Sequence, residues 1–467
     1  MLLRTYLILF LLSFLNIGIG QISYLQDEFY NQTVVDRGLL HPVGLTFDAN
    51  GVGYIWLKRG LVLLMNTEGE LIEQPLIDIS EEVSGDGDHG LVGFVLDPQF
   101  LTNGYFYLYY AVDRHHLMHF GKPEYDANIT IEKEATIGRI TRYQADVATN
   151  FTTTLPNSRK VLVGKDLTES NFPILMTSHG VGSLSFGQDG TLLASFGDAA
   201  GFQQRDIGSA EETYYQQALA DGIITEKENV GSFKSQMLSS LAGKIIRIDP
   251  ETGNGIASNP YFDAAQPKAA ASRIWAMGLR NPYRFIFKPE SGEHDPSLAQ
   301  PGTFVIGDVG AGSYEEISIL EEGGTNFGWP FYEGYKYAWQ FWNTKTLNQD
   351  AVNPLFTEQR CDREFFYFDE LFKEENAQQD YAYINPCDTA FSIADAVTTF
   401  VHKRPALAFS NFSWNPPTTA LVGVFNAEGR ADTQSVETQP SIEAVNFDGY
   451  SVIPGFFYDG DIFPEQY

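Results

Sequence analysis

The stretch SHGVGSLSFGQDGTLLASFGD, residues 178–198, decides the fold of this chain. An alternating apolar run covers 181–186, a second covers 192–196, and a Gln-Asp-Gly turn separates them. Alternation with a period of two is typical of strands with one buried face, and a glycine in the turn suits a tight hairpin. We therefore expect a β-hairpin that is led by the histidine at position 179.

The same pattern recurs along the chain. Comparable segments open at His41, His89 and Gly278, and each places an apolar strand before turn residues. Self-similar units of three or four short antiparallel strands, separated by long insertions, are typical of a β-propeller. A β-sandwich, the other all-β architecture, gives no reason to repeat a hairpin and a third strand in one order. The expected third strands lie at 60–66, 138–144, 243–250 and 315–323.

The first twenty residues are typical of a secretory signal. One basic residue, Arg4, precedes an apolar run from Tyr6 to Leu15 and small residues near position 20. An uncleaved membrane anchor is the alternative, although the run is short for a membrane span. We predict a signal peptide at 1–20, a secreted or periplasmic protein, and no stable membrane insertion after cleavage. The propeller then covers 21–467, with long loops inserted at about 112–136, 199–241 and 337–399.

The charge of the chain excludes some partners. The 60 Asp and Glu residues outnumber the 30 Lys and Arg residues, which gives a formal net charge of −30. A polyanion of this kind is repelled by nucleic acid and by anionic membrane surfaces. We therefore expect neither as a partner.

The chain has two cysteines, Cys361 and Cys387, inside the 337–399 insertion. In an oxidising compartment they are expected to pair and to stabilise that insertion by roughly 3 kcal/mol. The alternative is two free buried thiols. No histidine lies near them in the sequence, so a metal site is not indicated.

Three further segments have more than one interpretation. His115, His116 and His119 suggest a metal cluster, but surface loop histidines are the favoured interpretation because neighbours on an extended segment point to opposite faces. The acidic segment 85–88 suggests calcium, yet it lacks further oxygen ligands at fixed offsets, which favours a plain turn. The apolar spacing within 211–219 predicts a helix.

The histidines at strand starts are the first candidates for a site. His41, His89 and His179 each precede the first strand of a repeat, so in a propeller all of them surround the mouth of the central channel. Two interpretations stay open. Histidine caps the strand start in every repeat, or His179 is a catalytic base whose pKa near neutrality suits proton transfer.

Arg280 and Asn281 occupy the equivalent strand start in the run WAMGLRNP. A buried guanidinium needs a partner, which is either an anionic ligand or a carboxylate of the chain such as Asp198. The position therefore indicates a polar site at the same channel mouth.

Several segments together resemble the glucose/sorbosone dehydrogenase family, which includes soluble quinoprotein glucose dehydrogenases and aldose sugar dehydrogenases. The similar segments lie within residues 38–335 and read HGVGSLSFGQDGTLLASFGD, LAGKIIRIDPETGNGIASNPYFD, IWAMGLRNPYRFIFKPESG and GDVGAGSYEEISILEEGGTNFGWPFYEG. The resemblance implies a six-bladed β-propeller of four-stranded blades and an exported enzyme. It also implies oxidation of the anomeric hydroxyl of a sugar to a lactone, with hydride transfer to pyrroloquinoline quinone (PQQ) and an external electron acceptor.

The resemblance also implies roles for individual residues. His179 matches the general base, and Arg280 with Asn281 matches the pair that holds the quinone oxygens. Gly310 and Ala311 match the positions whose backbone carbonyls bind the Ca²⁺ of the cofactor, an ion that prefers hard oxygen ligands. Asp88 matches a position that contacts the cofactor.

This sequence departs from the family pattern in three places. Ser178 stands where the glucose dehydrogenases have an aspartate, and Asp88 stands where they have a glutamine. After Trp414 the chain resembles the start of a fifth blade and stops within it, so the later basic residues that hold the carboxylates of the cofactor have no counterpart. We expect a fragment whose propeller is truncated in its fifth blade, with closure by a partner as the alternative.

Two function hypotheses follow from these observations. The first is an exported sugar dehydrogenase that depends on PQQ and Ca²⁺. The second is a catalytically silent propeller that binds carbohydrate or a protein partner. A lactone hydrolase needs a ring of carboxylate and amide ligands around a catalytic calcium, for which Asn281 and Asp308 are too few.

Overall fold

The computed structural model describes residues 39–167, 169–411, 420–439 and 449–457. Strands dominate this part of the chain, and its longest α-helix has seven residues. The all-β class that the sequence predicts is confirmed. The α-helices are α2 (Phe100–Asn103), α3 (Arg114–His119), α4 (Tyr215–Asp221), α5 (Ala270–Arg273), α6 (Trp339–Trp342) and α7 (Pro354–Thr357). Short 3-10 helices lie at 147–149, 226–228, 231–236, 296–298, 368–371, 393–395 and 436–438.

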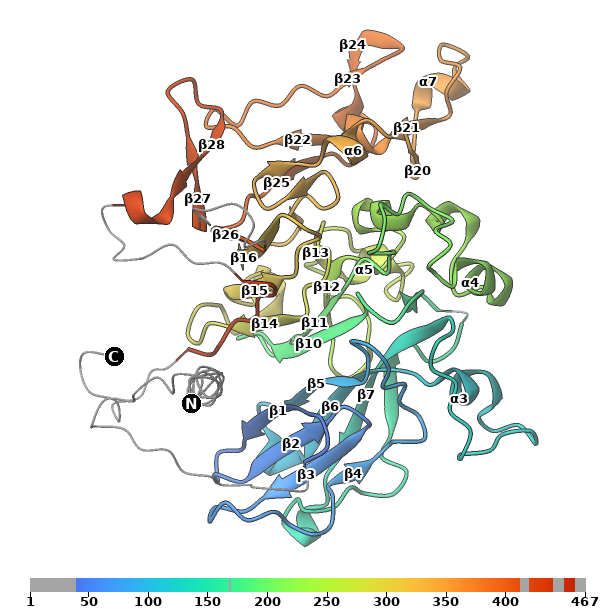
Figure 1. Cartoon of the computed structure of the whole chain (residues 1–467), viewed down its shortest axis with the longest axis vertical. Coiled ribbons are helices and arrows are strands. Elements are labelled where there is room, and N and C mark those ends of the chain that lie inside the picture. The colour runs from blue at the N-terminus through green and yellow to red at the C-terminus, as the bar shows by residue number, and fades with distance from the viewer. Residues whose placement is uncertain (1–38, 168, 412–419, 440–448, 458–467) are drawn as a thin grey trace, which may run out of the picture. The chain divides into compact units, whose positions relative to one another are not determined.

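Two antiparallel sheets come from the N-terminal third of the chain (Figure 1). In both, consecutive strands are neighbours, as the repeated hairpin and third strand predict. The first contains β1 (Pro42–Phe47), β2 (Gly53–Leu57), β3 (Leu61–Met65) and β4 (Ile77–Asp78). The second contains β5 (Leu91–Leu96), β6 (Tyr105–Ala111), β7 (Thr136–Gln144), β8 (Lys160–Val163) and β9 (Phe172–Ile174), which pairs with β7.

The third and fourth sheets begin in the same way and then recruit later strands. The third contains β10 (Val181–Phe186), β11 (Leu192–Phe196), β12 (Lys244–Ile248) and β13 (Ile274–Met277), followed by β17 (Thr325–Asn326), β25 (Phe400–His402) and β22 (Phe372–Glu374). The fourth contains β14 (Arg284–Phe287), β15 (Phe304–Asp308), β16 (Tyr314–Leu320), β26 (Leu407–Ser410), β27 (Ala420–Phe425) and β28 (Ala431–Ser435).

The expected fifth blade is not separate in the described residues. Trp414 lies outside them, and β27 pairs with β26 and so continues the fourth sheet. The remaining strands form small hairpins. They are β18 (Tyr332–Glu333) with β19 (Lys336–Tyr337), β20 (Leu347–Val352) with β21 (Phe365–Tyr367), and β23 (Ile384–Asn385) with β24 (Asp388–Ser392).

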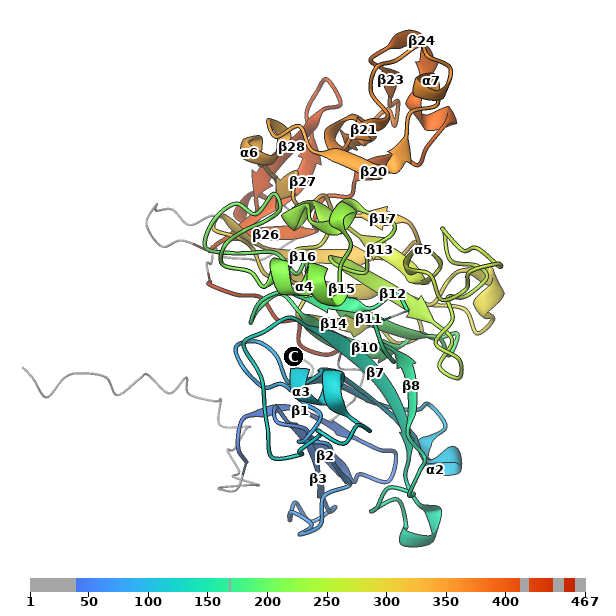
Figure 2. The same cartoon turned by 90° about the vertical axis from the view of Figure 1, so that its right-hand side faces the viewer.

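The first strands of the four sheets lie beside one another at their N-terminal ends (Figures 1 and 2). The Ser183 hydroxyl on β10 accepts a hydrogen bond from the backbone N–H of Phe285 on β14, at 3.2 Å. Arg284 donates to the carbonyls of Val92 on β5 and Val43 on β1, at 3.1 and 3.3 Å. Residues that precede these strands therefore gather at one end of the sheets.

The main core lies between the first three sheets. Every residue of β6 from Phe106 to Ala111 is buried, because neighbouring sheets cover both of its faces. Trp56 and Phe94 stack between the first and second sheets, with ring centroids 5.4 Å apart. Burial of large side chains of this kind contributes about 1.5–3 kcal/mol each. The packing of each sheet against the next therefore stabilises the fold.

The structure corrects the interpretation of the histidines in the 112–136 insertion. They lie in helix α3 rather than in a surface loop, because the Asp113 side chain caps the helix by accepting from the His116 N–H at 3.2 Å. His115 and His116 are buried. His115 accepts from the Asp126 N–H at 3.1 Å, and His116 lies 3.8 Å from a Glu82 carboxylate oxygen. His116 therefore lies against the Glu82 segment that precedes β5, and His115 bonds within the insertion.

The 199–241 insertion contains the expected helix, at a different position. Helix α4 begins at Tyr215 rather than at position 211, because Thr213 closes a turn on the Ala210 carbonyl. It ends at Gly222, which adopts the left-handed conformation with φ of 74°.

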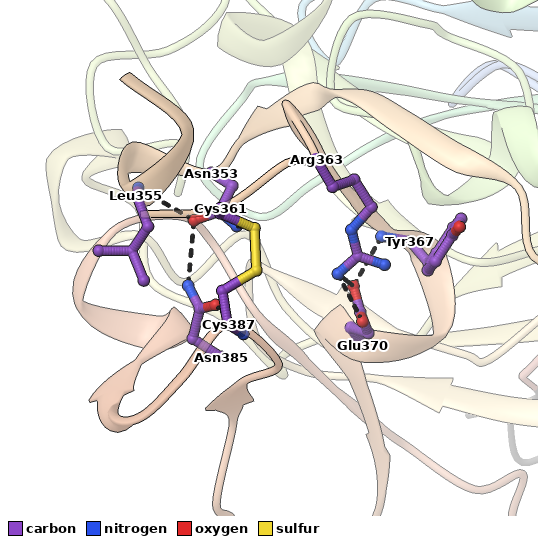
Figure 3. Close-up of a disulfide and its surroundings, with 8 residues drawn as sticks. All are labelled: Asn353, Leu355, Cys361, Arg363, Tyr367, Glu370, Asn385 and Cys387. Carbon is purple, nitrogen blue, oxygen red and sulfur yellow. Dashed lines mark hydrogen bonds and ion pairs between the residues drawn. A yellow bond between two sulfur atoms is a disulfide. The ribbon is translucent and has the colours of Figure 1, made fainter. Parts of the chain in front are cut away.

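The cysteine prediction is confirmed. Cys361 and Cys387 form a disulfide with their Cα atoms 5.5 Å apart (Figure 3). The Asn353 side chain lies beside it and accepts from the N–H of Leu355 and from the Asn385 amide, at 3.1 and 3.0 Å. The insertion also has a small core of its own, made of Ala351, Phe366, Leu371, Tyr383 and Ile393.

No helix within the described ranges is long and apolar enough to cross a membrane. The predicted signal peptide at 1–20 lies outside those ranges.

Candidate functional site

His179 and Asp198 form a buried pair at the entrance of the third sheet. The Nδ1 atom of His179 lies 2.8 Å from Oδ1 of Asp198, and both residues are buried. The other carboxylate oxygen accepts from the indole N–H of Trp329 at 2.7 Å. The hairpin makes this pairing possible, because Gly197 on the second strand bonds to the Gly180 carbonyl beside the histidine.

The surroundings fix the protonation of this pair. Burial and the charge of Arg280 lower the pKa of His179, and Asp198 opposes them only in part. Burial works against ionisation of Asp198, but His179, Arg280 and Lys234 hold the pKa of that carboxyl below its ordinary value. A neutral imidazole that donates its Nδ1–H to the carboxylate leaves Nε2 free as a proton acceptor. The pair therefore has the form of a general base with an orienting carboxylate.

Arg280 precedes β14 and is held mainly by backbone groups. Its Nη1 donates to the carbonyls of Val309 and Gly310, at 2.8 and 2.7 Å. The guanidinium also lies over the Trp329 ring, 5.5 Å from the ring centroid. Within the described residues Arg280 forms no salt bridge, and Asp198, the partner considered from the sequence, bonds to His179 instead. Arg280 therefore makes no direct ion pair within the described residues, although its charge still acts on the nearby Asp198 carboxylate.

Asp308 fixes the backbone at Arg280 and Asn281. Its two carboxylate oxygens accept from the N–H groups of these residues, at 2.9 and 2.6 Å. Burial raises the pKa of Asp308 to about 7, against the effect of the two hydrogen bonds. Asn281 is itself buried, and its carbonyl accepts from the Val309 N–H at 3.2 Å.

The loop at Gly310 and Ala311 wraps around one carboxylate. A single oxygen of Glu333 accepts from four consecutive N–H groups, those of residues 311–314, at 2.7–3.2 Å. A Cβ at Gly310 would lie 1.7 Å from the Tyr314 carbonyl, so this tight turn requires glycine. The N–H groups are thus committed to Glu333, while the Gly310 carbonyl points to Arg280.

A cavity of about 330 Å³ opens beside these residues. It contains three cationic side chains, Arg205, Arg280 and Lys336, and Arg205 bridges its two sides by donating to the Gln340 carbonyl at 2.7 Å. The Phe202 ring lines it and lies 5.9 Å from the His179 ring. The cavity is lined by residues 201–206, 311–313 and 336–341 and by Ser232, Arg280, Trp329 and Glu333.

The structure separates the predicted site residues into two groups. Arg280 and Ala311 line the cavity. His179, Asn281 and Gly310 are not among the described residues that line it. The His179 ring lies 5.9 Å from the ring of the lining residue Phe202, and its partner Asp198 bonds to the lining residue Trp329.

The other strand-start residues differ from one another. Asp88 is exposed and accepts a hydrogen bond from the Ser178 hydroxyl. His89 is buried, and burial lowers its pKa to about 4. His41 is exposed.

The model of the glucose/sorbosone dehydrogenase family matches residues 39–360. The chain belongs to this family. Three curated relatives of this glucose/sorbosone dehydrogenase family member are the HIPL2 protein of Arabidopsis thaliana, quinoprotein glucose dehydrogenase B of Acinetobacter calcoaceticus and the human Hedgehog-interacting protein.

Their similarity to the chain is moderate. HIPL2 is 28% identical over 63% of this chain and 40% of its own length. The Acinetobacter protein is 25% identical over 68% of this chain and 56% of its own length. The Hedgehog-interacting protein is 26% identical over 55% of this chain and 31% of its own length. The chain thus spans from about a third to just over half of these relatives.

Sequence reasoning missed several residues of the site in this family member. Asp198 was considered only as a partner of Arg280, although the hairpin pairing places it opposite His179. Trp329 and Glu333 come from a segment far along the chain, and no spacing in the sequence links them to His179. Phe202 and Arg205 lie in an insertion without a periodic pattern.

Proposed function

We propose that the chain is an exported quinoprotein sugar dehydrogenase that oxidises the anomeric hydroxyl of an aldose to a lactone, with PQQ and Ca²⁺ as cofactors and an external electron acceptor. The observation that carries this proposal is that Arg280, which forms no salt bridge within the described residues, lines a cavity, and that a histidine–carboxylate pair contacts the lining residues Trp329 and Phe202. Membership of the glucose/sorbosone dehydrogenase family supports it. In this proposal the four sheets are blades of a six-bladed propeller, and residues 1–20 are its signal peptide.

The residues of the cavity fit PQQ. This quinone is planar and carries carboxylates, and the cavity offers Arg205, Arg280 and Lys336 as counter-charges with the Trp329 ring as an apolar wall. A volume of about 330 Å³ is within the range of small-molecule sites. Arg280 and Asn281 would hold the quinone oxygens, and Asp88 is a further proposed contact.

The proposed Ca²⁺ would have to be held by backbone oxygens at the Glu333 loop, where the Gly310 carbonyl already accepts from Arg280 at 2.7 Å. Because four N–H groups of this loop are committed to Glu333, the carbonyls of Gly310 and Ala311 are the groups proposed to bind the ion. Within the described residues, no group of three or more His, Cys, Asp or Glu side chains is arranged around a metal position. Carbonyl ligands would therefore have to supply most of the coordination.

When bound, PQQ supplies an ortho-quinone that accepts the hydride of the sugar carbon, and Ca²⁺ polarises it. His179 removes the hydroxyl proton at Nε2, and Asp198 holds the imidazole in the required tautomer and stabilises the imidazolium that forms. Arg280 stabilises the negative charge that develops beside it. Phe202 and Trp329 exclude water from this base.

The proposal is tested by dye reduction with aldoses after PQQ and Ca²⁺ have been added to the full chain. Quinone binding is followed separately by absorbance. The enzyme proposal predicts both binding and sugar-dependent reduction, and the absence of quinone binding would refute it.

A catalytically silent propeller that binds carbohydrate or a protein partner is the second candidate. The similarity to the Hedgehog-interacting protein favours it, because that relative is as similar to the chain as the glucose dehydrogenase is. This candidate predicts that the chain binds neither PQQ nor Ca²⁺ at the cavity. Saturable binding of a sugar or a protein without dye reduction would support it.

A further inference from the structure

The loop that precedes β5 in the second sheet packs against the turn that carries His179. The backbone N–H of Asp88 donates to the Thr177 carbonyl at 2.8 Å. Gly87 adopts a left-handed φ of 55°, and a Cβ there would lie 2.0 Å from the same carbonyl. The backbone at Gly87 therefore approaches the backbone at Thr177 so closely that only glycine fits at position 87.

Two side chains of this loop hold the residues on either side of His179. The Ser178 hydroxyl donates to a carboxylate oxygen of Asp88. The His89 ring fills the space beside Gly180, where a Cβ would lie 2.6 Å from its Nε2 atom. The positions before and after His179 are thus both fixed by the second sheet, although His179 belongs to the third.

His179 needs this support because its backbone is strained. Its φ of 54° is uncommon for a residue other than glycine. Such a conformation persists where the surroundings support it. If Ser178 is not held, the backbone at His179 can relax and the imidazole can leave the position that Asp198 gives it.

We propose that Asp88 is a positioning residue for His179, acting through the hydroxyl of Ser178, rather than only a contact of the cofactor. This inference rests on the proposed dehydrogenase function. Asp88 is exposed, so its carboxylate is not consumed by a buried ion pair. Its carboxylate accepts a hydrogen bond from the hydroxyl of the residue that directly precedes the base.

The charges around His179 make the role of Asp88 measurable. Arg280 lowers the pKa of His179, while Asp198 and Asp88 raise it. His89 stays neutral because burial lowers its pKa to about 4. Lys234 acts on Asp198 rather than on the imidazole. Loss of the Asp88 charge therefore lowers the pKa of His179 further, whereas loss of the Ser178 hydroxyl leaves that charge in place.

Five variants and one control separate the hydrogen bond from the charge. Asp88→Ala and Ser178→Ala each break the bond, and we expect each to lower kcat roughly tenfold, with the double variant no worse than Asp88→Ala. Asp88→Asn keeps an acceptor but removes the charge, so its plateau rate should fall less than that of Asp88→Ala, while the acidic limb of the pH profile moves to lower pH. The exchange Asp88→Ser with Ser178→Asp restores the pair and most of the rate. Asp86→Ala is the matched control, because Asp86 lies in the same loop, 4.0 Å from Lys133.

The ligand-free chain provides a readout that does not depend on quinone. The ring signals of His179, assigned with His179→Gln, are titrated by NMR in wild type, Asp88→Asn, Asp86→Ala and the exchange variant. Only Asp88→Asn should lower the titration midpoint. A chain that fails to bind PQQ refutes the proposed function, whereas equal midpoints in Asp88→Asn and Asp86→Ala refute the positioning role. Additive losses in the double variant, or a loss confined to quinone affinity, would also overturn it.

Discussion

His41 and His179 occupy the same place in two repeats and differ in almost everything around them. Both adopt a left-handed backbone, with φ of 53° and 54°. The carbonyl of each accepts the N–H of a residue just after the second strand, Lys58 at 3.0 Å and Ala199 at 3.2 Å. His41 is exposed, whereas His179 is buried against Asp198. The repeat therefore determines the backbone conformation at the strand start, whereas the surrounding residues determine whether the histidine can act as a base.

The comparison explains why histidine recurs at these positions. Histidine is among the few residues that tolerate the left-handed region, so the repeat alone accounts for His41. At His179 the 199–241 insertion adds Phe202, and the segment between β17 and β18 adds Trp329; these side chains shield the His179–Asp198 pair from water. The two interpretations of the repeated histidine, a strand cap and a base, are thus compatible at one position.

Replacing His179 by alanine should have the largest effect. Loss of a positioned base lowers turnover roughly 10²–10⁴-fold, while quinone binding, measured by absorbance, is retained. His41→Ala removes the histidine with the same backbone conformation and should leave turnover within about twofold of wild type. Equal losses of turnover in the two variants would show that both histidines only stabilise the fold.

Arg280→Ala should impair both binding and turnover. It removes the unpaired charge at the cavity, so quinone affinity should fall by roughly tenfold or more, with a loss of kcat in addition. Arg59→Ala is the control, because Arg59 is paired with Glu132 on the surface. If Arg280→Ala binds PQQ as tightly as Arg59→Ala does, the cavity is not the quinone site.

Trp329→Phe should have a moderate effect on the base. The substitution removes the indole N–H that bonds to Asp198 and keeps an aromatic wall. A hydrogen bond to a charged group is worth about 1.5–3 kcal/mol, so turnover should fall by roughly tenfold or more. His41 has no carboxylate partner among the described residues. Trp329→Phe should therefore affect only the His179–Asp198 pair. Steady-state kinetics at saturating quinone would measure this loss, and an unchanged kcat would contradict the orienting role of Asp198.

The smallest expected effect is on the thermal stability of the protein and comes from Asp308, which holds the backbone before β14. In the folded state the pKa of Asp308 is raised to about 7, above the ordinary value of 3.8. Its contribution to stability is therefore fully present below about pH 4 and is lost as the pH rises through 7. We expect the Tm to fall by roughly 5 °C over this interval from this group, and Asp308→Asn should flatten that slope. A steeper slope in the variant, measured by calorimetry, would contradict the assignment.

The sequence predicts the repeated strands well because their information is local. Alternation and turn glycines place β10 and β11, and the disulfide partners are the only two cysteines. The histidines of the 112–136 insertion were misread because a single helix-capping residue, Asp113, decides that segment. The start of α4 was predicted at the wrong residue because a single turn, closed by Thr213 on the Ala210 carbonyl, determines it.

The cavity could not be predicted in the same way. Phe202, Trp329 and Glu333 meet only after the third and fourth sheets have packed and two insertions have folded over them. Neither spacing nor composition connects positions that are separated by more than 100 residues. The resemblance to the family supplied His179 and Arg280 because it carries this three-dimensional information.

The most direct test is a titration of the full chain with PQQ in the presence of Ca²⁺, followed by tryptophan fluorescence and by absorbance. The account predicts saturable binding of one quinone per chain, with quenching that Trp329→Phe reduces and that His41→Ala leaves unchanged. Absence of saturable binding, or quenching that is identical in Trp329→Phe, would contradict the claim that the His179–Arg280 strand starts form a quinone site.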